Sequence, residues 1–173
     1  MRYTEKDRAY FSQPADTLAP LILGKTLVRC LPHGKLYRVK ITEVEAYGAL
    51  DLANYGFGYE GNGGNKRKTK ANSPLFEQGG TCCVYGGMLL LVCGQVGKPE
   101  NILIRKAAAE ETYFTGPMSI CKNLLIDSNL HGEDLLSSDK LWMSDDLDEL
   151  RICKLPRVNV TKDKEKKCRF VTI

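Results

Sequence analysis

An alternating segment from Leu36 to Tyr47 limits the possible folds of this chain more than any other stretch of its sequence. Apolar and polar residues follow one another along it, which predicts a β-strand whose successive side chains point to opposite faces. Thr26–Leu31 alternates in the same way, and Pro32-His33-Gly34 between the two segments is typical of a turn. The sequence therefore predicts two strands joined as a hairpin, and a fold that contains a β-sheet.

The rest of the chain adds short strands beside glycine pairs and only a few helical segments. Further strands are predicted at Thr81–Tyr85, Met88–Cys93, Asn101–Lys106, Arg157–Val160 and near Phe170. Helices are predicted at Leu18–Leu23, which ends at Gly24, and from Pro117, where apolar residues recur at helical spacing. Mixed strands with few helices favour the α+β class.

The length and composition of the chain are those of one globular domain. Of its 173 residues, 43% are hydrophobic and 27% charged, which is enough for a core and unlike a disordered chain. No repeat or linker divides it, so we expect residues 1–173 to form a single domain. The longest apolar run, Met88–Cys93, is far below the roughly 20 residues that span a bilayer. The first residues are too polar for a secretory signal, so we expect an intracellular protein that is not in a membrane.

Basic side chains gather in two segments of the sequence. The chain carries 25 basic and 21 acidic side chains, a net charge of +4. Lys66–Lys70 and the tail 151–173 are basic, whereas Asp139–Glu149 is acidic. A solvated surface is one interpretation of such runs, and binding of a polyanion is the other.

Cysteine and histidine are placed unfavourably for a metal site. The seven cysteines are scattered along apolar runs, and the two histidines, His33 and His131, are far apart. No C-x-x-C pair is present, so free thiols in a reducing compartment are a better interpretation than zinc ligands. The scarcity of histidine also argues against catalysis by Ser-His-Asp or Cys-His pairs.

Two carboxylates, Glu43 and Glu45, lie on the long predicted strand. Strict alternation places both on one face with the apolar residues before them and the tyrosine after them, Val39, Ile41 and Tyr47. An unpaired carboxylate is costly in such a place, so the pair lies either at a rim or in a functional site. An edge strand with both glutamates facing solvent is the alternative.

An arginine and several aromatic residues could complete such a site. Arg105 ends the apolar strand Ile102–Arg105, where its planar guanidinium either neutralises a buried carboxylate or lies exposed at a strand end. Aromatic residues on or beside the framing loops either stack an extruded base or pack the loops. These are Tyr47, Tyr55, Phe57, Tyr59 and Tyr85.

A series of short motifs runs along the chain in a fixed order. The motifs are Leu21–Arg29, Glu43–Tyr47, Asp51–Tyr55, Thr69–Phe76, Val84–Met88, Leu103–Arg105 and Thr115–Cys121. Together they resemble the alkyladenine (3-methyladenine) DNA glycosylase family over residues 18–145, with weaker matches at Arg157–Val160 and Cys168–Phe170. The resemblance implies an α+β fold, a single domain with a curved, mainly antiparallel β-sheet flanked by a few helices.

The same resemblance implies a monofunctional DNA N-glycosylase. Such an enzyme hydrolyses the N-glycosidic bond of alkylated or deaminated purines by base flipping and so initiates base excision repair. Glu45 corresponds to the general base that activates the attacking water, Arg105 to the arginine that holds both, and Glu43 to a supporting residue. The base-pocket positions are Tyr47, Tyr55, Tyr85, Cys93 and Ala53. The DNA-binding positions are Arg67, Thr69, Asn72, Leu75, Gly86 and Met88.

The resemblance also implies a partner and a place of action. The partner is double-stranded DNA containing damaged purines, bound by a monomer that needs neither a metal nor an organic cofactor. We expect the protein in the nucleus if its source is eukaryotic, and in the cytoplasm or nucleoid if it is bacterial.

The sequence departs from the family's pattern in the pocket that takes the base. Tyr55 stands where the family has a histidine, and Cys93 where it has an asparagine that helps exclude guanine. Ala71 replaces an arginine beside the DNA-binding positions. The range of substrates is therefore expected to differ from the family's.

A second departure concerns the side chain that wedges into DNA. Between Val84 and Met88 the chain is two residues shorter than the pattern. The wedge tyrosine is thus either lost, with Gly86 in its place, or supplied by Tyr85. Two alternative functions follow: a catalytically weak or inactive family member that binds DNA or damage, and a structural domain whose basic segments are only surface.

Overall fold

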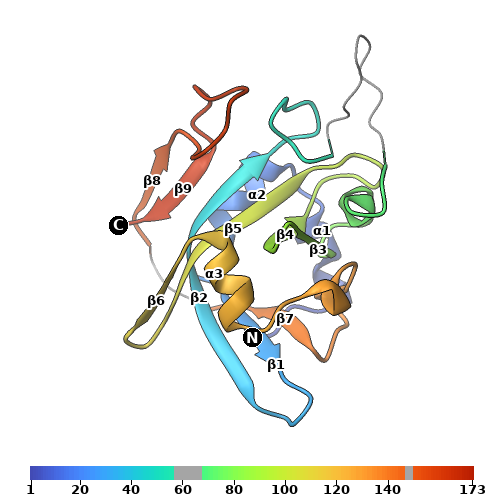
Figure 1. The fold of residues 1–173 in the computed structure, drawn as a ribbon, viewed down its shortest axis with the longest axis vertical. Helices are drawn as coiled ribbons and strands as arrows, with labels where there is room; N and C mark the ends of the chain where they lie inside the picture. The colour runs from blue at the N-terminus through green and yellow to red at the C-terminus, as the bar shows by residue number, and fades with distance from the viewer. Residues whose placement is uncertain (57–67, 147–149) are drawn as a thin grey trace.

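A long central strand, β2 (Leu36–Tyr47), organises the molecule, with the same bounds that the alternation predicts. The computed structural model describes residues 1–56, 68–146 and 150–173. β2 pairs in antiparallel fashion with β1 (Thr26–Cys30), β5 (Asn101–Ala109) and β9 (Arg169–Thr172). Figure 1 shows β2 and β5 as long curved ribbons that cross the whole molecule.

The described residues form one nine-stranded antiparallel sheet. Its main path runs β3-β4-β5-β2-β1-β7, while β6 pairs with β5 and β8 with β9. The remaining strands are β3 (Cys82–Tyr85), β4 (Met88–Val92), β6 (Thr112–Thr115), β7 (Leu141–Ser144) and β8 (Ile152–Leu155). The curled sheet and few helices confirm the predicted α+β fold.

Short helices cover the sheet at a few places. The α-helices are α1 (Arg8–Phe11), α2 (Ala15–Ile22) and α3 (Pro117–Asn123), and the 3-10 turns are η1 (Glu5–Asp7), η2 (Ser73–Phe76) and η3 (Ser128–Leu130). α2 begins after Pro14, earlier than the predicted Leu18, and packs on β2. α3 begins at Pro117 as predicted and lies against β4, β5 and β6 (Figure 1).

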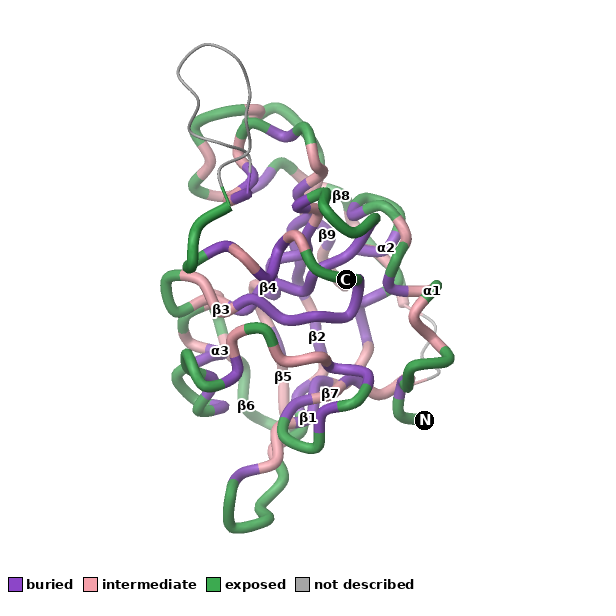
Figure 2. Tube along the Cα trace, turned by 90° about the vertical axis from the view of Figure 1, so that its right-hand side faces the viewer, coloured by how far each residue is buried: buried purple, intermediate pink, exposed green. Residues whose placement is uncertain are grey.

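The buried side chains form two clusters on opposite sides of the sheet strands. The main core includes Val44, Ala46, Ile102 and Ile104 with the buried face of α2. We call the smaller group the second cluster; its buried members are Tyr47, Leu75, Cys83, Leu90, Val92 and Leu103. Figure 2 shows buried residues along β2 and β4 and exposed residues at the turns. Because the strands lie between the two clusters, alternate side chains of one strand point into different clusters.

The β2–β5 ladder has two irregularities, and because of them the carboxylates do not share a face with Val39 and Ile41 as the sequence predicts. Ile41 pairs with Ala107, Glu43 with Lys106 and Val44 with Ile104, so each strand carries an extra residue near this point. Such a bulge shifts the alternation by one residue. Val39 and Ile41 therefore lie in the main core together with Val44 and Ala46, whereas Glu45 and Tyr47 face the other side. The prediction that all five alternating residues share one face is wrong for this reason.

The strand predicted at Arg157–Val160 is also wrong, because β8 ends at Leu155 and the next residues form a bend. The guanidinium of Arg157 points inward and donates to the carbonyl of Ala46 at 3.1 Å. The segment uses its polar groups for internal contacts with side chains and carbonyls of β2, so it does not join a ladder. β6, β7 and β8 are not among the strands that the sequence predicts, whereas β9 contains the strand expected near Phe170.

None of the helices that the structure describes is both long and apolar enough to cross a membrane. The seven cysteines are all unpaired, and four of them are buried. Burial raises the pKa of the Cys82, Cys83 and Cys121 thiols to about 12, so these thiols are protonated and unreactive at neutral pH.

Candidate active site

Glu45 lies near the end of β2 and is held by three donors. Its side chain is fully buried, yet it lines a cavity on the side of the second cluster. The hydroxyl of Tyr47 donates to Oε2 at 2.8 Å, and the backbone N–H of Val158 donates to Oε1 at 2.7 Å. Nη1 of Arg105 donates to Oε2 at 3.3 Å. A charge-assisted set of this kind fixes the orientation of the carboxylate before any ligand arrives.

Arg105 connects the two glutamates of β2. Its Nε donates to Oε1 of Glu43 at 3.2 Å while Nη1 reaches Glu45. The bulge in β5 at this position breaks the regular ladder and accompanies the turn of the guanidinium toward the carboxylates. The side chain is only 13% exposed, so the alternative of an exposed arginine at a strand end is excluded. The predicted convergence of Glu45 and Arg105 is observed.

Glu43 is a buried carboxylate surrounded by cations. Lys106 Nζ lies 2.7 Å from its Oε2, and Nη1 of Arg169 donates to Oε1 at 3.1 Å, in addition to Arg105. Burial alone would raise the pKa of Glu43, but the hydrogen bonds from Lys106 and Arg169 outweigh it and leave the pKa below its ordinary value. The alternative of solvent-facing glutamates on an edge strand is excluded, because β2 is central and Glu43 is 1% exposed.

We predict that Glu43→Gln makes stability less dependent on pH. Because the pKa of Glu43 is lower in the folded state than its unfolded value of about 4.3, its stabilisation is complete above that value and is lost as pH falls through the folded pKa. The variant should lose about 1–3 kcal/mol of unfolding free energy at pH 7, and this difference should shrink toward pH 3. Urea unfolding across this range measures it, with exposed Glu111→Gln as the control. A difference that stays constant with pH would contradict the prediction.

Three tyrosines form an aromatic wall beside Glu45. The rings of Tyr47 and Tyr55 are 5.7 Å apart between centroids, and those of Tyr55 and Tyr85 are 5.0 Å apart, each pair tilted. Burial, the charge of Glu45 and the hydrogen bond to it raise the pKa of Tyr47 far above its ordinary value. The hydroxyl of Tyr47 is therefore protonated and available as a donor to Glu45.

The cavity in front of Glu45 has a volume of about 350 Å³, which lies within the range of about 300–1,000 Å³ that is typical of small-molecule sites. Strands and loops far apart in the sequence enclose it. The buried and half-buried side chains of three strands and a loop line one part of it: Glu45, Tyr47, Tyr55, Met88, Leu103 and Arg105. The segments 115–119 and 158–160 complete the lining, and we call them its rim because they contain its exposed residues, Thr115, Met118 and Asn159.

A buried ion pair supports the cavity wall from behind. The guanidinium of Arg157 lies 4.6 Å from the centre of the Tyr47 ring, and Nη2 donates to Oδ1 of Asp51 at 3.1 Å. The Arg157 side chain has no exposed surface, and Asp51 is 6% exposed. This pair holds the loop after β2 against the segment that carries Val158, and so fixes both Tyr47 and the N–H donor to Glu45.

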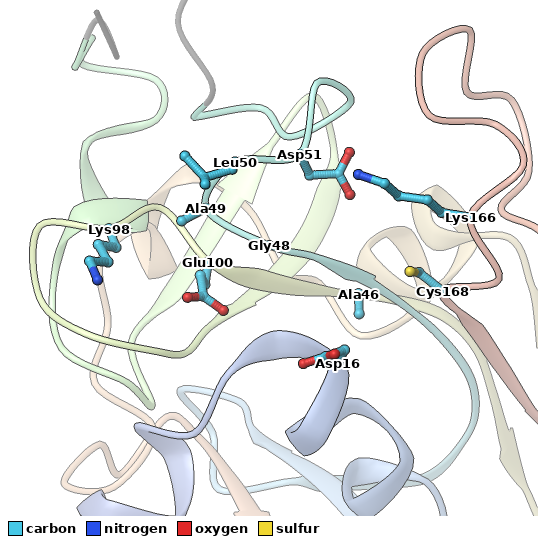
Figure 3. A pocket seen from close by; sticks show the side chains of 10 residues that line it. All are labelled: Asp16, Ala46, Gly48, Ala49, Leu50, Asp51, Lys98, Glu100, Lys166 and Cys168. Atoms are coloured by element: carbon cyan, nitrogen blue, oxygen red, sulfur yellow. The ribbon is translucent and has the colours of Figure 1, made fainter. Parts of the chain in front are cut away.

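A second cavity of about 510 Å³ lies on the other side of β2 (Figure 3). Ala46 lines it, while the neighbouring Glu45 and Tyr47 line the first cavity, as alternation along a strand requires. Figure 3 shows the Asp51 carboxylate pointing toward Lys166 at one end, with Asp16 and Glu100 along the wall. Glu100 accepts the N–H of Ala15 at 2.9 Å, which gives it a structural role at the start of α2.

Comparison with known proteins decides the family. The family model of methylpurine-DNA glycosylase matches residues 9–173. The chain belongs to this family. A protein from Methanocella arvoryzae that bears the name 3-methyladenine DNA glycosylase is 31% identical over 88% of this chain and 83% of its own length. A protein of the same name from Chlorobium phaeovibrioides is 27% identical over 96% of this chain and 92% of its own length. The DNA-3-methyladenine glycosylase of Mus musculus is 30% identical over 78% of this chain and 46% of its own length.

The match confirms the resemblance that the motifs indicate, and with it the enzyme class, a DNA glycosylase. Among the described residues, no group of three or more histidine, cysteine, aspartate or glutamate side chains could hold a metal ion.

The structure brings most of the predicted base-pocket residues of this glycosylase together. Tyr47 and Tyr55 line the cavity, and Tyr85 and Ala53 pack against the second cluster behind it. Cys93 does not line the cavity, contrary to the prediction. It directly follows β4 and is fully buried in the main core, because alternation places Val92 in the second cluster and the next residue on the opposite side.

The predicted DNA-binding residues are divided between the surface and the interior. Gly86 is exposed at the β3–β4 turn, Met88 lines the cavity, and Thr69 is exposed. The prediction that Leu75 contacts DNA does not agree with the structure, because Leu75 is fully buried in the second cluster and has no exposed surface. Arg67, like Lys66, Phe57 and Tyr59, lies outside the described residues.

Asn72 is buried, with 6% of its surface exposed. Its Oδ1 accepts the N–H of Thr69 at 2.7 Å, and its Nδ2 donates to the carbonyl of Tyr55 at 3.2 Å. The contact ties the segment after the basic residues to the aromatic wall. Its predicted contact with DNA stays a prediction.

Two features of the glycosylase site were missed from the sequence. One is the Val158 N–H on Glu45, a backbone group that no residue type reveals. The other is the Arg157–Asp51 pair, which joins residues separated by 106 positions. The only sequence signal for either feature was the weak family match at Arg157–Val160, and this segment was interpreted as a strand within a basic tail.

Proposed function

We propose that this chain hydrolyses the N-glycosidic bond of damaged purines in double-stranded DNA. The observation that carries the proposal is the fixed, buried carboxylate of Glu45, which lines a cavity together with Tyr47 and Tyr55. A duplex base can reach this carboxylate only after rotation out of the helix.

Glu45 is well suited to activate a water molecule. A carboxylate offers about four acceptor sites, and three are occupied by Tyr47, Val158 and Arg105. The remaining lone pair can accept a hydrogen bond from water beside the Arg105 guanidinium. The water oxygen forms a bond to C1′ of the nucleotide, the C1′–N bond breaks with its electron pair leaving on the base, and the carboxylate takes the water's proton. The products are an abasic site and the free base.

The choice of base follows from the charges of the cavity. Among the described residues that line it, Glu45 is the only carboxyl group, so no second acid stands ready to protonate the departing base. A purine that is cationic through alkylation leaves as a neutral molecule and needs no such acid. The faces of Tyr47 and Tyr55 also attract an electron-poor ring. Alkylated purines are therefore the proposed preferred substrates, with deaminated purines slower.

The wider setting of this activity is also part of the proposal. Residues 1–173 act as a single domain and a monomer, in the nucleus of a eukaryote or the cytoplasm and nucleoid of a bacterium. Two basic segments of the chain, Lys68–Lys70 and the tail from Arg151, supply cations for phosphate contacts.

Release of base from defined duplexes tests the function. Oligonucleotides that contain 3-methyladenine, 7-methylguanine, 1,N6-ethenoadenine or hypoxanthine are incubated with the protein, and abasic product is detected by alkaline strand cleavage. We expect release of at least one lesion, fastest for a cationic purine, and none from undamaged DNA. Binding to these duplexes without release of any of the four bases would overturn the proposal in favour of an inactive DNA-binding member of the family.

A further inference from the structure

A base cannot leave the stack without leaving a gap behind it. Proteins that bend or open a duplex often fill such a gap with an apolar side chain, frequently methionine, leucine, isoleucine or phenylalanine. In a protein that flips a base into the Glu45 cavity, an exposed apolar side chain at the cavity's rim is suited to this task. This inference rests on the proposed function.

The β3–β4 turn has no side chain for this task. Its tip is Gly86-Gly87, and both residues are exposed. Their φ angles are +56° and +78°, a left-handed conformation that suits glycine and makes a tight two-residue hairpin. No atom beyond the backbone projects from this turn.

The two residues that flank the turn are committed elsewhere. The ring of Tyr85 contacts that of Tyr55 in a tilted arrangement with ring centres 5.0 Å apart, and its side chain packs on the second cluster. Met88 is half-buried, lines the cavity and packs against the second cluster. Each would have to leave these contacts to enter DNA.

Met118 has the required position and exposure. It is the second residue of α3, its side chain lines the rim of the cavity, and it is 63% exposed. Among the described residues of the cavity lining, it is the only large apolar side chain that is strongly exposed. A Cβ atom placed on Gly87 would lie 3.7 Å from Met118 Cε and 4.0 Å from its Cγ, so the thioether lies beside the glycine turn.

The base of this side chain is rigid while its tip is adaptable. α3 is anchored by Ile120 and Cys121, which are buried against the main core, and begins at Pro117, whose ring fixes the first turn. The unbranched thioether has three rotatable bonds and adapts to an irregular gap. The bare glycine turn leaves the side chain room to swing toward bound DNA.

We propose that Met118 is the wedge of this enzyme, the side chain that enters the base stack as the damaged nucleotide moves into the cavity. The glycine turn has no side chain that could enter DNA, and beside it α3 presents the exposed Met118.

The test combines an excision assay with a probe of stacking. The parent, Met118→Ala and Met118→Leu are compared on a duplex with 1,N6-ethenoadenine or 7-methylguanine, and on the same strand without its complement. A 2-aminopurine beside an abasic analogue reports by its fluorescence whether the neighbouring stack is opened. Leu36→Ala, an exposed apolar residue at the far end of β2, is the matched control.

We expect Met118→Ala to slow single-turnover excision from the duplex about 10-fold, equal to about 1.4 kcal/mol, and to lower the 2-aminopurine signal. Excision from single-stranded DNA should change less than about 2-fold, as for a surface substitution. Met118→Leu should restore most of the duplex activity, since it keeps the apolar volume. A purely structural role for Met118 would instead slow both substrates equally.

The outcomes separate this proposal from the function on which it rests. If the parent excises base and Met118→Ala matches it on duplex DNA, the wedge is overturned and the glycosylase function stands. If the parent opens the 2-aminopurine stack without excision, and Met118→Ala abolishes that opening, the wedge is supported and the function is overturned. If the parent neither excises nor opens the stack, both proposals fail.

Discussion

Replacing Glu45 by glutamine is expected to abolish base excision while leaving the fold and DNA binding in place. Glutamine has the shape of glutamate but cannot take the proton of the attacking water. Loss of a general base lowers the rate by about 100- to 10,000-fold, and we expect the upper part of this range because no other carboxylate lines the described cavity.

The hydrogen bonds of Glu45 also predict a small change of stability. The amide of glutamine has only one acceptor oxygen, whereas Tyr47, Val158 and Arg105 all donate to the carboxylate. At least one donor then faces an NH₂ group, which costs about 1–3 kcal/mol. Binding to lesion-containing DNA should be kept or tightened, because a negative charge inside the cavity that receives the nucleotide is removed.

Single-turnover excision, DNA binding by fluorescence anisotropy and urea unfolding together measure these effects. Glu111→Gln removes an equal charge at the exposed β5–β6 turn and should behave as the parent in all three. Excision by Glu45→Gln within about 10-fold of the parent would contradict the role of Glu45, since a general base contributes at least about 100-fold.

Local patterns in the sequence predicted the strand that carries the site. The alternation of Leu36–Tyr47 depends on neighbouring residues alone, so the bounds of β2 follow from it. The position of Arg105 after an apolar run left two interpretations open, a guanidinium that neutralises a buried carboxylate and one that lies exposed at a strand end. The family motifs favoured the first, and the hydrogen bond of 3.3 Å from Arg105 to Glu45 agrees with it.

The sequence carries a signal of the bulge near Thr42 that the assumption of strict alternation overlooked. Val39 and Ile41 are followed by Val44 and Ala46, so the apolar phase changes at Thr42-Glu43, where the register against β5 has its extra residue. Without the bulge, Val39 and Ile41 would share a face with Glu45, and the main core would lose two of its apolar side chains. The need to bury those side chains and to present the Glu45 carboxylate to the cavity favours the irregular ladder.

Contacts across long stretches of sequence leave no comparable local signal. Leu75 belongs to a motif associated with DNA contact, but the η2 turn directs it into the second cluster. Arg157 lies in a basic tail, where an arginine is usually exposed, and only its distant partner Asp51 reveals that it is internal. A single sequence does not show which charges of opposite sign meet in the fold.

The Arg157–Asp51 pair yields the second large expected effect. In Arg157→Met, the buried Asp51 loses its counter-ion and the Ala46 carbonyl loses a donor, while the Tyr47 ring loses the cation above it. Breaking a buried pair by removing one partner costs about 3–5 kcal/mol, which is a large part of a small domain's stability. The variant should therefore unfold at much lower urea concentration than the parent.

Excision should fall as well, because Arg157 fixes the backbone that carries the Val158 N–H to Glu45. A displacement of about 1 Å in a catalytic arrangement lowers rates by up to about 100-fold, so activity should drop even at a temperature where the variant is folded. Arg157→Lys keeps the charge without the planar fork and should lie between parent and Arg157→Met in both measurements. This intermediate variant keeps the prediction testable if Arg157→Met does not fold.

Arg151→Met is the matched control, since it removes the same charge from an exposed position of the same tail. It should change the unfolding free energy by less than about 0.5 kcal/mol. It should weaken DNA binding only through the loss of one cation, an effect that salt diminishes. If Arg157→Met resembled Arg151→Met in urea unfolding and in excision, the tail would act as a basic surface alone. If the expected difference is found, the same tail both attracts DNA and holds the wall of the active site in place.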